Sequence, residues 1–196
     1  MLRPGSTSPS GAEELPVIEP FLARPRSAAV LEQVDRIFFE ASGTKRFSSA
    51  AERVAFHDRW LGRYLAHDAE HAFLAFSQAS GGNDEVAGYL VGSLDDPAQA
   101  PRFDDLAYFR QLATYTARYP ASLHVNLAPE WRARGVGRLL VDAFCRHAAL
   151  AGARGVHVFT GRGMRNVGFY QSAGFCEVAA VAWNGRDIVM LARELT

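Results

Sequence analysis

Residues 127–140 read LAPEWRARGVGRLL, and this segment indicates the architecture of the chain. Before it lies the run ASLHVNLA at 121–128, in which apolar and polar residues alternate as in a half-buried strand. After it, apolar residues recur at helical spacing to about residue 151. Gly135 and Gly137 therefore lie where a strand turns into a helix, whose first N–H groups have no partner within the helix. Such a helix start attracts phosphate, so the segment predicts an anion site.

Arginines gather around the same segment. The chain carries 21 basic and 21 acidic residues, which gives a formal charge of zero. Residues 130–165 hold seven arginines, and only Glu130 and Asp142 oppose them. The overall balance argues against a protein that coats nucleic acid or an anionic membrane with its whole surface. The local surplus of positive charge instead fits one small anionic ligand held at one helix end.

The composition also narrows the class of protein. The chain has no run of about 18 apolar residues that could cross a bilayer, and its amino end lacks the apolar core of a secretory signal. Cys145 and Cys176 form no CxxC or CxxH pattern, so we expect no metal site and a reduced, cytoplasmic setting. Residues 1–12 are expected to be a disordered leader, followed by a single domain over residues 13–196.

The periodicities predict an α/β fold with hairpins at both ends and one strand–helix–strand unit between them. Strands are expected over residues 15–21, 72–78, 86–94, 121–128, 156–160, 175–183 and 186–194. Besides the helix that follows the glycine turn, helices are expected over residues 27–41, 48–66, 104–117 and 166–172. The SGGND cluster and Asn184-Gly185 favour tight hairpin turns. The prolines in the first strand make it an edge strand.

Two motifs, in this order, resemble those of a known family. LAPEWRARGVGRLL is similar to the acyl-CoA-binding motif of the GNAT acetyltransferases, Q/R-x-x-G-x-G/A after a strand that ends V-x-P-E. GFYQSAGF at residues 168–175 is similar to their second hallmark, FY-x-x-x-GF. Within this superfamily the chain looks most like the branch of bacterial acetyltransferases and the acetyltransferase-like domain of O-GlcNAc hydrolases. The resemblance implies a central mixed, largely antiparallel sheet flanked by helices, with acetyl-CoA as co-substrate.

The resemblance also implies roles for individual residues. Val125, Asn126 and Leu127 match the strand that pairs with the pantetheine arm, where an amide polarises the thioester carbonyl. Tyr170 matches the tyrosine that protonates the departing thiolate, although it could instead only pack its helix against the sheet. The loop that binds the pyrophosphate is matched by Arg132, Ala133, Arg134, Gly135, Val136, Gly137 and Arg138.

One position departs from the family pattern. Members of the family usually carry an asparagine seven residues before the tyrosine, in contact with the pantetheine, but this chain has Gly163 there. Asn166 stands three residues later, where the family usually has a small residue. Either the loop is rearranged so that Asn166 makes the contact, or the contact is absent.

No motif marks the general base that an ammonium acceptor would need. His124 is the first candidate, because it lies on the strand expected to line the acyl site and its ordinary pKa near 6.5 suits the task. A purely structural His124 is an equal alternative. Asp95 and Asp96, after the preceding strand, could act as base or bind a cationic acceptor. His157 has suitable chemistry but lies in a predicted core strand.

The sequence thus predicts direct acetyl transfer from acetyl-CoA to a primary amine in a ternary complex, with Tyr170 as general acid. The alternatives are a catalytically inactive acyl-CoA-binding regulatory module and, third, a nucleic-acid-binding protein that uses the seven arginines. Determinants of the acceptor are expected within residues 27–66 and 95–120. The carboxyl-terminal hairpin offers an edge through which a homodimer could form.

Overall fold

The computed structural model describes residues 15–77 and 85–195, so the predicted leader at 1–12 and the SGGND cluster lie outside the described residues. The strands are β1 (Val17–Pro20), β2 (Phe73–Phe76), β3 (Val86–Ser93), β4 (Ala121–Leu127), β5 (Gly155–Gly161), β6 (Cys176–Trp183) and β7 (Arg186–Glu194). The α-helices are α1 (Ala28–Ala41), α2 (Ala50–His57), α3 (Arg63–His67), α4 (Tyr108–Gln111), α5 (Ala113–Arg118), α6 (Val136–Leu150) and α7 (Asn166–Ser172). None of the helices in these ranges is both long and apolar enough to span a membrane.

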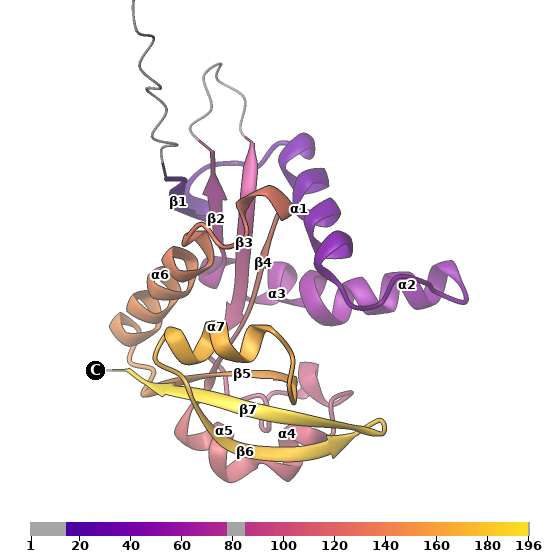
Figure 1. The fold of residues 1–196 in the computed structure, drawn as a ribbon, viewed down its shortest axis with the longest axis vertical. Helices are drawn as coiled ribbons and strands as arrows, with labels where there is room; N and C mark the ends of the chain where they lie inside the picture. Colours follow the sequence, from indigo (N-terminus) through magenta and orange to yellow (C-terminus); the bar gives the residue numbers. More distant parts are fainter. Residues whose placement is uncertain (1–14, 78–84, 196) are drawn as a thin grey trace, which may run out of the picture.

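The strands form one sheet in the order β1-β2-β3-β4-β5-β7-β6 (Figure 1). Neighbouring strands are antiparallel except β4 and β5, which run parallel. The predicted mixed, largely antiparallel sheet is therefore confirmed, as is the edge position of β1. The turn between β6 and β7 is also the predicted one, because Asn184 and Gly185 both adopt positive φ angles, 49° and 71°.

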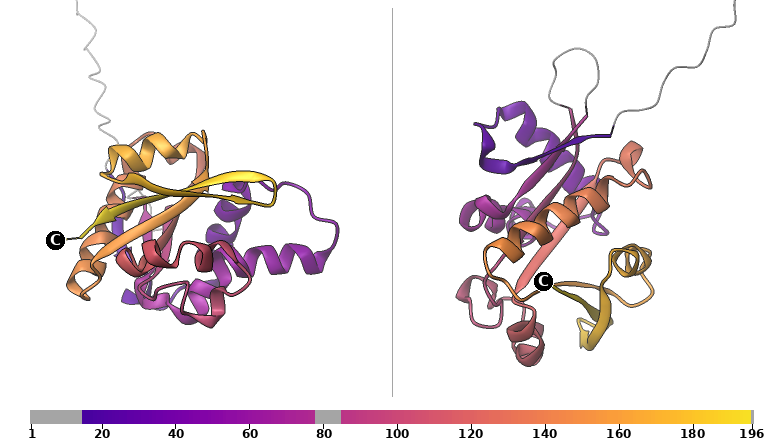
Figure 2. Two further views of the ribbon diagram at one scale, coloured as in Figure 1. Left: turned by 90° about the horizontal axis from the view of Figure 1, so that it is seen from below. Right: turned by 90° about the vertical axis from the view of Figure 1, so that its left-hand side faces the viewer.

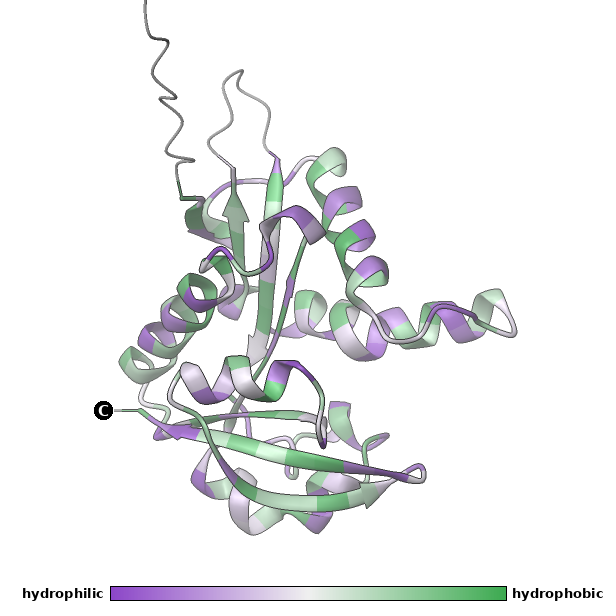
Figure 3. Cartoon of the chain, in the orientation of Figure 1, coloured by the Kyte–Doolittle hydropathy of each residue, from purple (hydrophilic) through white to green (hydrophobic). Residues whose placement is uncertain are grey.

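Helices cover both faces of the sheet (Figure 2). On one face α1 packs on β3 and β4 and buries Val30, Val34, Ile37 and Phe38. On the other face α6 packs on β2, β3 and β4 and buries Leu140, Phe144 and Ala148 among other residues. Figure 3 shows the same division along each helix, where hydrophobic and hydrophilic residues alternate in α1 and α6. The sheet between two apolar layers gives β4 a fixed position, on which the site depends.

Serine residues cap the starts of α1 and α2. The Ser27 hydroxyl accepts a hydrogen bond from the Val30 amide at 3.3 Å and caps α1. At the start of α2 the Ser49 hydroxyl accepts from the Glu52 amide at 3.1 Å, and the Glu52 carboxylate accepts from the Ser48 amide. The predicted helix over residues 48–66 continues from α2 into α3 through one turn of π-helix, Asp58–Gly62.

The predicted helix over residues 104–117 is wrong in part, because the structure breaks it into α4 and α5 at Leu112. The two pieces serve different parts of the core. Phe109 on α4 is buried in the apolar cluster beneath α1, whereas Leu112 packs with Tyr119 and Met190 of a separate cluster. The break lets α4 and α5 pack on these two clusters separately, so tertiary packing overrides the local pattern.

Candidate active site

β4 and β5 separate soon after they meet. Their pairing covers only Ala121 opposite Val156 and Ser122 opposite His157. In Figure 1 β2, β3 and β4 run upright, while β5, β7 and β6 run across below them. Beyond Ser122, β4 stays paired with β3 but has no β5 residue beside it in the part of the chain that the structure describes. The sheet therefore opens along one edge of the second half of β4.

The register of β4 decides which of its peptide groups face this opening. The Ala128 amide donates to the Ala87 carbonyl at 3.0 Å, and Asn126 lies opposite Tyr89 in the same ladder. Because hydrogen-bonded pairs alternate in an antiparallel ladder, the backbone of Asn126 bonds to β3. The peptide groups of Val125 and Leu127 then point into the opening. The Leu127 carbonyl accepts from Arg132 Nε at 3.2 Å, which ties the following loop to the strand.

The loop after β4 presents the start of α6. Ala133 and Gly135 adopt positive φ angles of 60° and 84°, and Gly135 is the N-cap residue. The Arg138 amide donates to the Gly135 carbonyl at 3.0 Å, whereas the amides of Val136 and Gly137 have no acceptor among the described residues. Unpaired amides at the positive end of a helix dipole form an anion site. These amides lie in the turn for which the sequence predicts an anion site.

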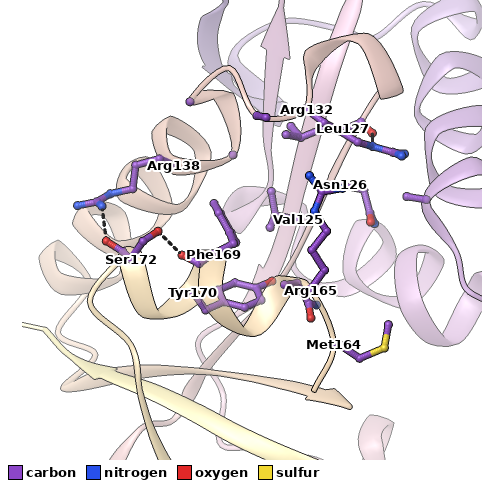
Figure 4. Close-up of a pocket in the computed structure, with 15 residues that line it drawn as sticks. Val125, Asn126, Leu127, Arg132, Arg138, Met164, Arg165, Phe169, Tyr170 and Ser172 are labelled. Atoms are coloured by element: carbon purple, nitrogen blue, oxygen red, sulfur yellow. Dashed lines mark hydrogen bonds between the residues drawn. The ribbon is translucent and has the colours of Figure 1, made fainter. Parts of the chain in front are cut away.

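A cavity of about 600 Å³ joins the opened edge of β4 to this helix start, and we call it the large cavity. Figure 4 shows its walls, with β4 and the turn after it on one side and α7 on the other. Ten of the predicted site residues line it: Val125, Asn126, Leu127, Arg132, Ala133, Gly135, Gly137, Arg138, Asn166 and Tyr170. Five lining residues escaped prediction: Ala41, Met164, Arg165, Phe169 and Ser172.

Three predicted residues are not among those that line the large cavity. The side chain of Val136 is fully buried beneath α6, so only its amide can serve the site. The guanidinium of Arg134 lies over the Trp131 ring, 5.4 Å from its centroid. His124 opens into a different cavity. Of the missed residues, Phe169 and Ser172 belong to the GFYQSAGF motif and could have been included from it.

Tyr170 lies on α7 with its ring packed between Phe169 and Phe175, at centroid distances of 5.0 and 5.5 Å. The residue is 5% exposed, and in Figure 4 its hydroxyl end points toward the space beside β4. Burial raises the pKa of Tyr170 above its ordinary value of 10.0. The hydroxyl therefore keeps its proton at neutral pH and can donate it.

The position at which the family pattern has asparagine is occupied differently here. Gly163 has a φ of +77°, so the loop before α7 takes a left-handed turn there. Asn166 is the first residue of α7 and lines the large cavity. Its Oδ1 accepts a hydrogen bond from the Thr160 hydroxyl at 2.7 Å, which fixes the amide and leaves Nδ2 as a donor.

Arg138 is already held by two partners. Its Nε donates to the Asp142 carboxylate at 2.7 Å, and Nη1 donates to the Ser172 carbonyl at 2.9 Å (Figure 4). The bond to Ser172 joins the start of α6 to the end of α7, and the bond to Asp142 within α6 holds the guanidinium in position. Arg138 therefore contributes a positioned charge.

His124 lies on the other side of β4, in a cavity of about 200 Å³ that we call the aromatic cavity. Its Nε2 is 3.0 Å from the Tyr64 hydroxyl. Burial, with smaller contributions from His157 and Arg63, lowers the pKa of His124 to about 4. The expected pKa near 6.5 is thus replaced by one at which His124 is neutral at pH 7 and only a weak base. The aromatic cavity is lined by Phe38, Ser42, Gly43, Phe56, Trp60, His124 and Asn126.

The other candidate bases line neither of these two cavities. Asp95 accepts from Arg102 at 2.9 Å, and Asp96 accepts from the Ala98 amide at 3.0 Å, beyond the end of β3 that lies away from Leu127. His157 is fully buried, and its Nδ1 is 2.5 Å from the Tyr119 carbonyl. These contacts give all three residues structural roles.

Comparison with known proteins identifies the family of the chain. The model of the acetyltransferase (GNAT) family matches residues 31–175. The crystal structure of SsHAT matches over 92% of this chain and 98% of that chain, with 23% identity and a TM-score of 0.68. The NatC complex bound to Gag peptide and CoA matches over 92% and 98%, with 15% identity and a TM-score of 0.62. The ribosomal-protein-S18-alanine N-acetyltransferase from Escherichia coli matches over 92% and 94%, with 14% identity and a TM-score of 0.55.

The structural neighbours are distant in sequence and show that the fold is shared. The family model carries more weight, because its match extends from α1 through the glycine turn to the end of the GFYQSAGF motif. It includes β4, the start of α6 and Tyr170, which bound the large cavity. The chain belongs to the acetyltransferase (GNAT) family.

Proposed function

We propose that this chain transfers an acetyl group from acetyl-CoA to a primary amine, with both substrates bound at once. The observation that carries the proposal is the separation of β4 from β5 beside the unpaired amides at the start of α6. An extended thioester arm can pair with the N–H and C=O of Val125 and the N–H of Leu127, while its pyrophosphate binds at the start of α6. Membership of an acetyltransferase family supports this use of the opening.

The residues present fit coenzyme A. The amides of Val136 and Gly137 would hold the pyrophosphate, and Arg132 supplies positive charge at the same end of the large cavity. Gly135 leaves open space where a side chain would stand, since nothing lies within 4 Å of a Cβ built there. Asn166 Nδ2 would donate to the pantetheine. Acetyl-CoA would supply an activated acetyl group as its thioester.

The chain's own groups account for the charges and protons of the transfer. The amine nitrogen forms a bond to the thioester carbon, and the carbon–sulfur bond breaks. Backbone N–H groups of β4 that face the opening would stabilise the negative charge that develops on the carbonyl oxygen. Tyr170 would donate its proton to the departing thiolate. Two substrates held side by side lose little further freedom on reaching the transition state.

The acceptor amine must also lose a proton, and Tyr170 does not account for its removal. Among the described residues, the side chains that line the two cavities include no carboxylate, and His124 is the only histidine among them. With its pKa lowered to about 4, His124 removes a proton from an ammonium only inefficiently. We therefore propose that the amine reacts from its neutral form, and that His124 receives its proton only after nitrogen–carbon bonding has begun.

The proposal predicts release of free thiol from acetyl-CoA that depends on added amine. The measurement follows thiol release with a panel of primary amines and then the mass of each product, which must increase by one acetyl group. Among the described residues, no carboxylate side chain lines either cavity. This also favours the second candidate, a regulatory module that binds acyl-CoA without turnover. Saturable CoA binding together with no thiol release for any amine would establish that module and refute the enzyme.

A further inference from the structure

We infer that the aromatic cavity is the acceptor subsite and that it takes the ring of an arylalkylamine, a primary amine on a short chain attached to one aromatic ring. The inference rests on the proposed function and names its substrate class. It is carried by the position, lining, volume and charge of this cavity.

The aromatic cavity adjoins the large cavity at two places. Asn126 lines both of them, so the end of β4 forms a shared wall. Ala41 lines the large cavity, and its neighbours Ser42 and Gly43 line the aromatic one. A molecule with its ring in the aromatic cavity can therefore extend a short chain past Asn126 toward the peptide groups of β4 that face the opening.

The walls of the aromatic cavity are mostly rings. Phe38 and Phe56 lie 5.5 Å apart between centroids, with their planes tilted by 45°. The Trp60 and His124 rings pack edge to face, with their centroids 5.5 Å apart and an angle of 74° between their planes. Rings in tilted and edge-to-face arrangements bind a further aromatic ring better than an aliphatic chain of equal size, because their quadrupoles align with it.

The volume restricts the ligand to one ring. An apolar cavity of about 150 Å³ accommodates a benzene molecule. The aromatic cavity, at about 200 Å³, has room for one ring and the first atoms of a chain. A polyamine or a peptide would have to leave most of its length outside.

The side chains that line the two cavities disfavour a positively charged amine group on the acceptor. The aromatic cavity is lined by no Asp, Glu, Lys or Arg side chain of the described residues. The large cavity is lined by Arg132, Arg138 and Arg165, and by no carboxylate from the same part of the chain. An ammonium group would thus lose hydration without gaining a counter-ion, so the pocket selects the neutral amine.

A substitution at Gly43 can test the subsite without removing any existing side-chain contact. It lines the aromatic cavity, a Cβ built on it meets nothing within 4 Å, and its φ lies outside the left-handed region. The Gly43→Leu variant should therefore fold normally and fill the subsite. Val54, which is 66% exposed on α2, gives a matched control as Val54→Leu.

The experiment measures kcat/KM for 2-phenylethylamine, butylamine and spermidine, together with CoA affinity. The wild type should prefer 2-phenylethylamine over the other two by at least about tenfold. Gly43→Leu should reduce that preference by about tenfold or more with CoA affinity unchanged, and Val54→Leu should leave both unchanged. Gly43→Ala, which adds only one methyl group, should give a smaller loss of preference.

The outcomes separate the two proposals. If butylamine or spermidine is used as well as 2-phenylethylamine, or if Gly43→Leu keeps the wild-type preference, the acceptor subsite is refuted while acetyl transfer stands. If no amine in the panel is acetylated, the proposed function itself fails and this inference fails with it.

Discussion

Replacing Tyr170 by phenylalanine should lower the turnover number about a hundredfold, because the departing thiolate would then have to take its proton from water. The substitution should affect catalysis and leave the fold intact. Its ring is buried between Phe169 and Phe175, so phenylalanine keeps the packing and removes only the hydroxyl. The affinity for CoA should stay within about twofold of wild type, since the phosphate groups bind at the start of α6.

The pH profile adds a second readout. Burial raises the pKa of Tyr170, so the hydroxyl stays protonated and the wild-type turnover number should show no alkaline decline from Tyr170 below about pH 10. Tyr108→Phe is the matched control, because Tyr108 is likewise buried but packs against Phe159 and Trp183, away from the large cavity. Equal turnover numbers for Tyr170→Phe and wild type at every pH would remove Tyr170 from the mechanism.

The second large effect concerns Gly135. A valine there should weaken CoA binding by about tenfold or more, because its side chain would fill the open space in front of the α6 amides. The substitution also forces a β-branched residue into a φ of 84°, which costs about 1–2 kcal/mol of folding stability. Isothermal titration with CoA measures the first effect, and urea unfolding measures the second.

A valine at Gly152 serves as a control that distinguishes loss of folding stability from loss of CoA binding. It has a φ of +88° and, like Gly135, nothing within 4 Å of a Cβ built on it, but it follows the other end of α6. Gly152→Val should lose a similar amount of folding stability and keep the wild-type affinity for CoA. If both variants bind CoA equally, the start of α6 does not hold the pyrophosphate.

Much of the fold could be predicted from local patterns. The alternation in ASLHVNLA predicted β4 with Leu123 on one face and His124 on the other, and Asn184-Gly185 predicted the last hairpin. The starts predicted at residues 27 and 48 lie at or beside the N-caps of α1 and α2, Ser27 and Ser49. These features depend on neighbours in sequence, so the chain itself contains the information needed to place them.

Features set by distant contacts were harder to predict. The break at Leu112 depends on two separate core clusters, and the lowered pKa of His124 depends on burial beside Tyr64 and Trp60 from another part of the chain. Phe56 and Trp60, which line the aromatic cavity, lie within the residues 27–66 in which acceptor determinants were expected, but the helical pattern did not single them out. The division between Val125 and Leu127, which face the opening, and Asn126, which bonds to β3, required the strand register.

We propose that the opened edge of β4 and the start of α6 together hold acyl-CoA. Amide hydrogen exchange, followed by NMR with and without saturating CoA, measures this binding at single residues. We expect slower exchange at Val125, Leu127, Val136 and Gly137, with no change at the Asn126 amide that already bonds to β3. Unchanged exchange at those four amides in the CoA-bound protein would show that acyl-CoA does not bind there.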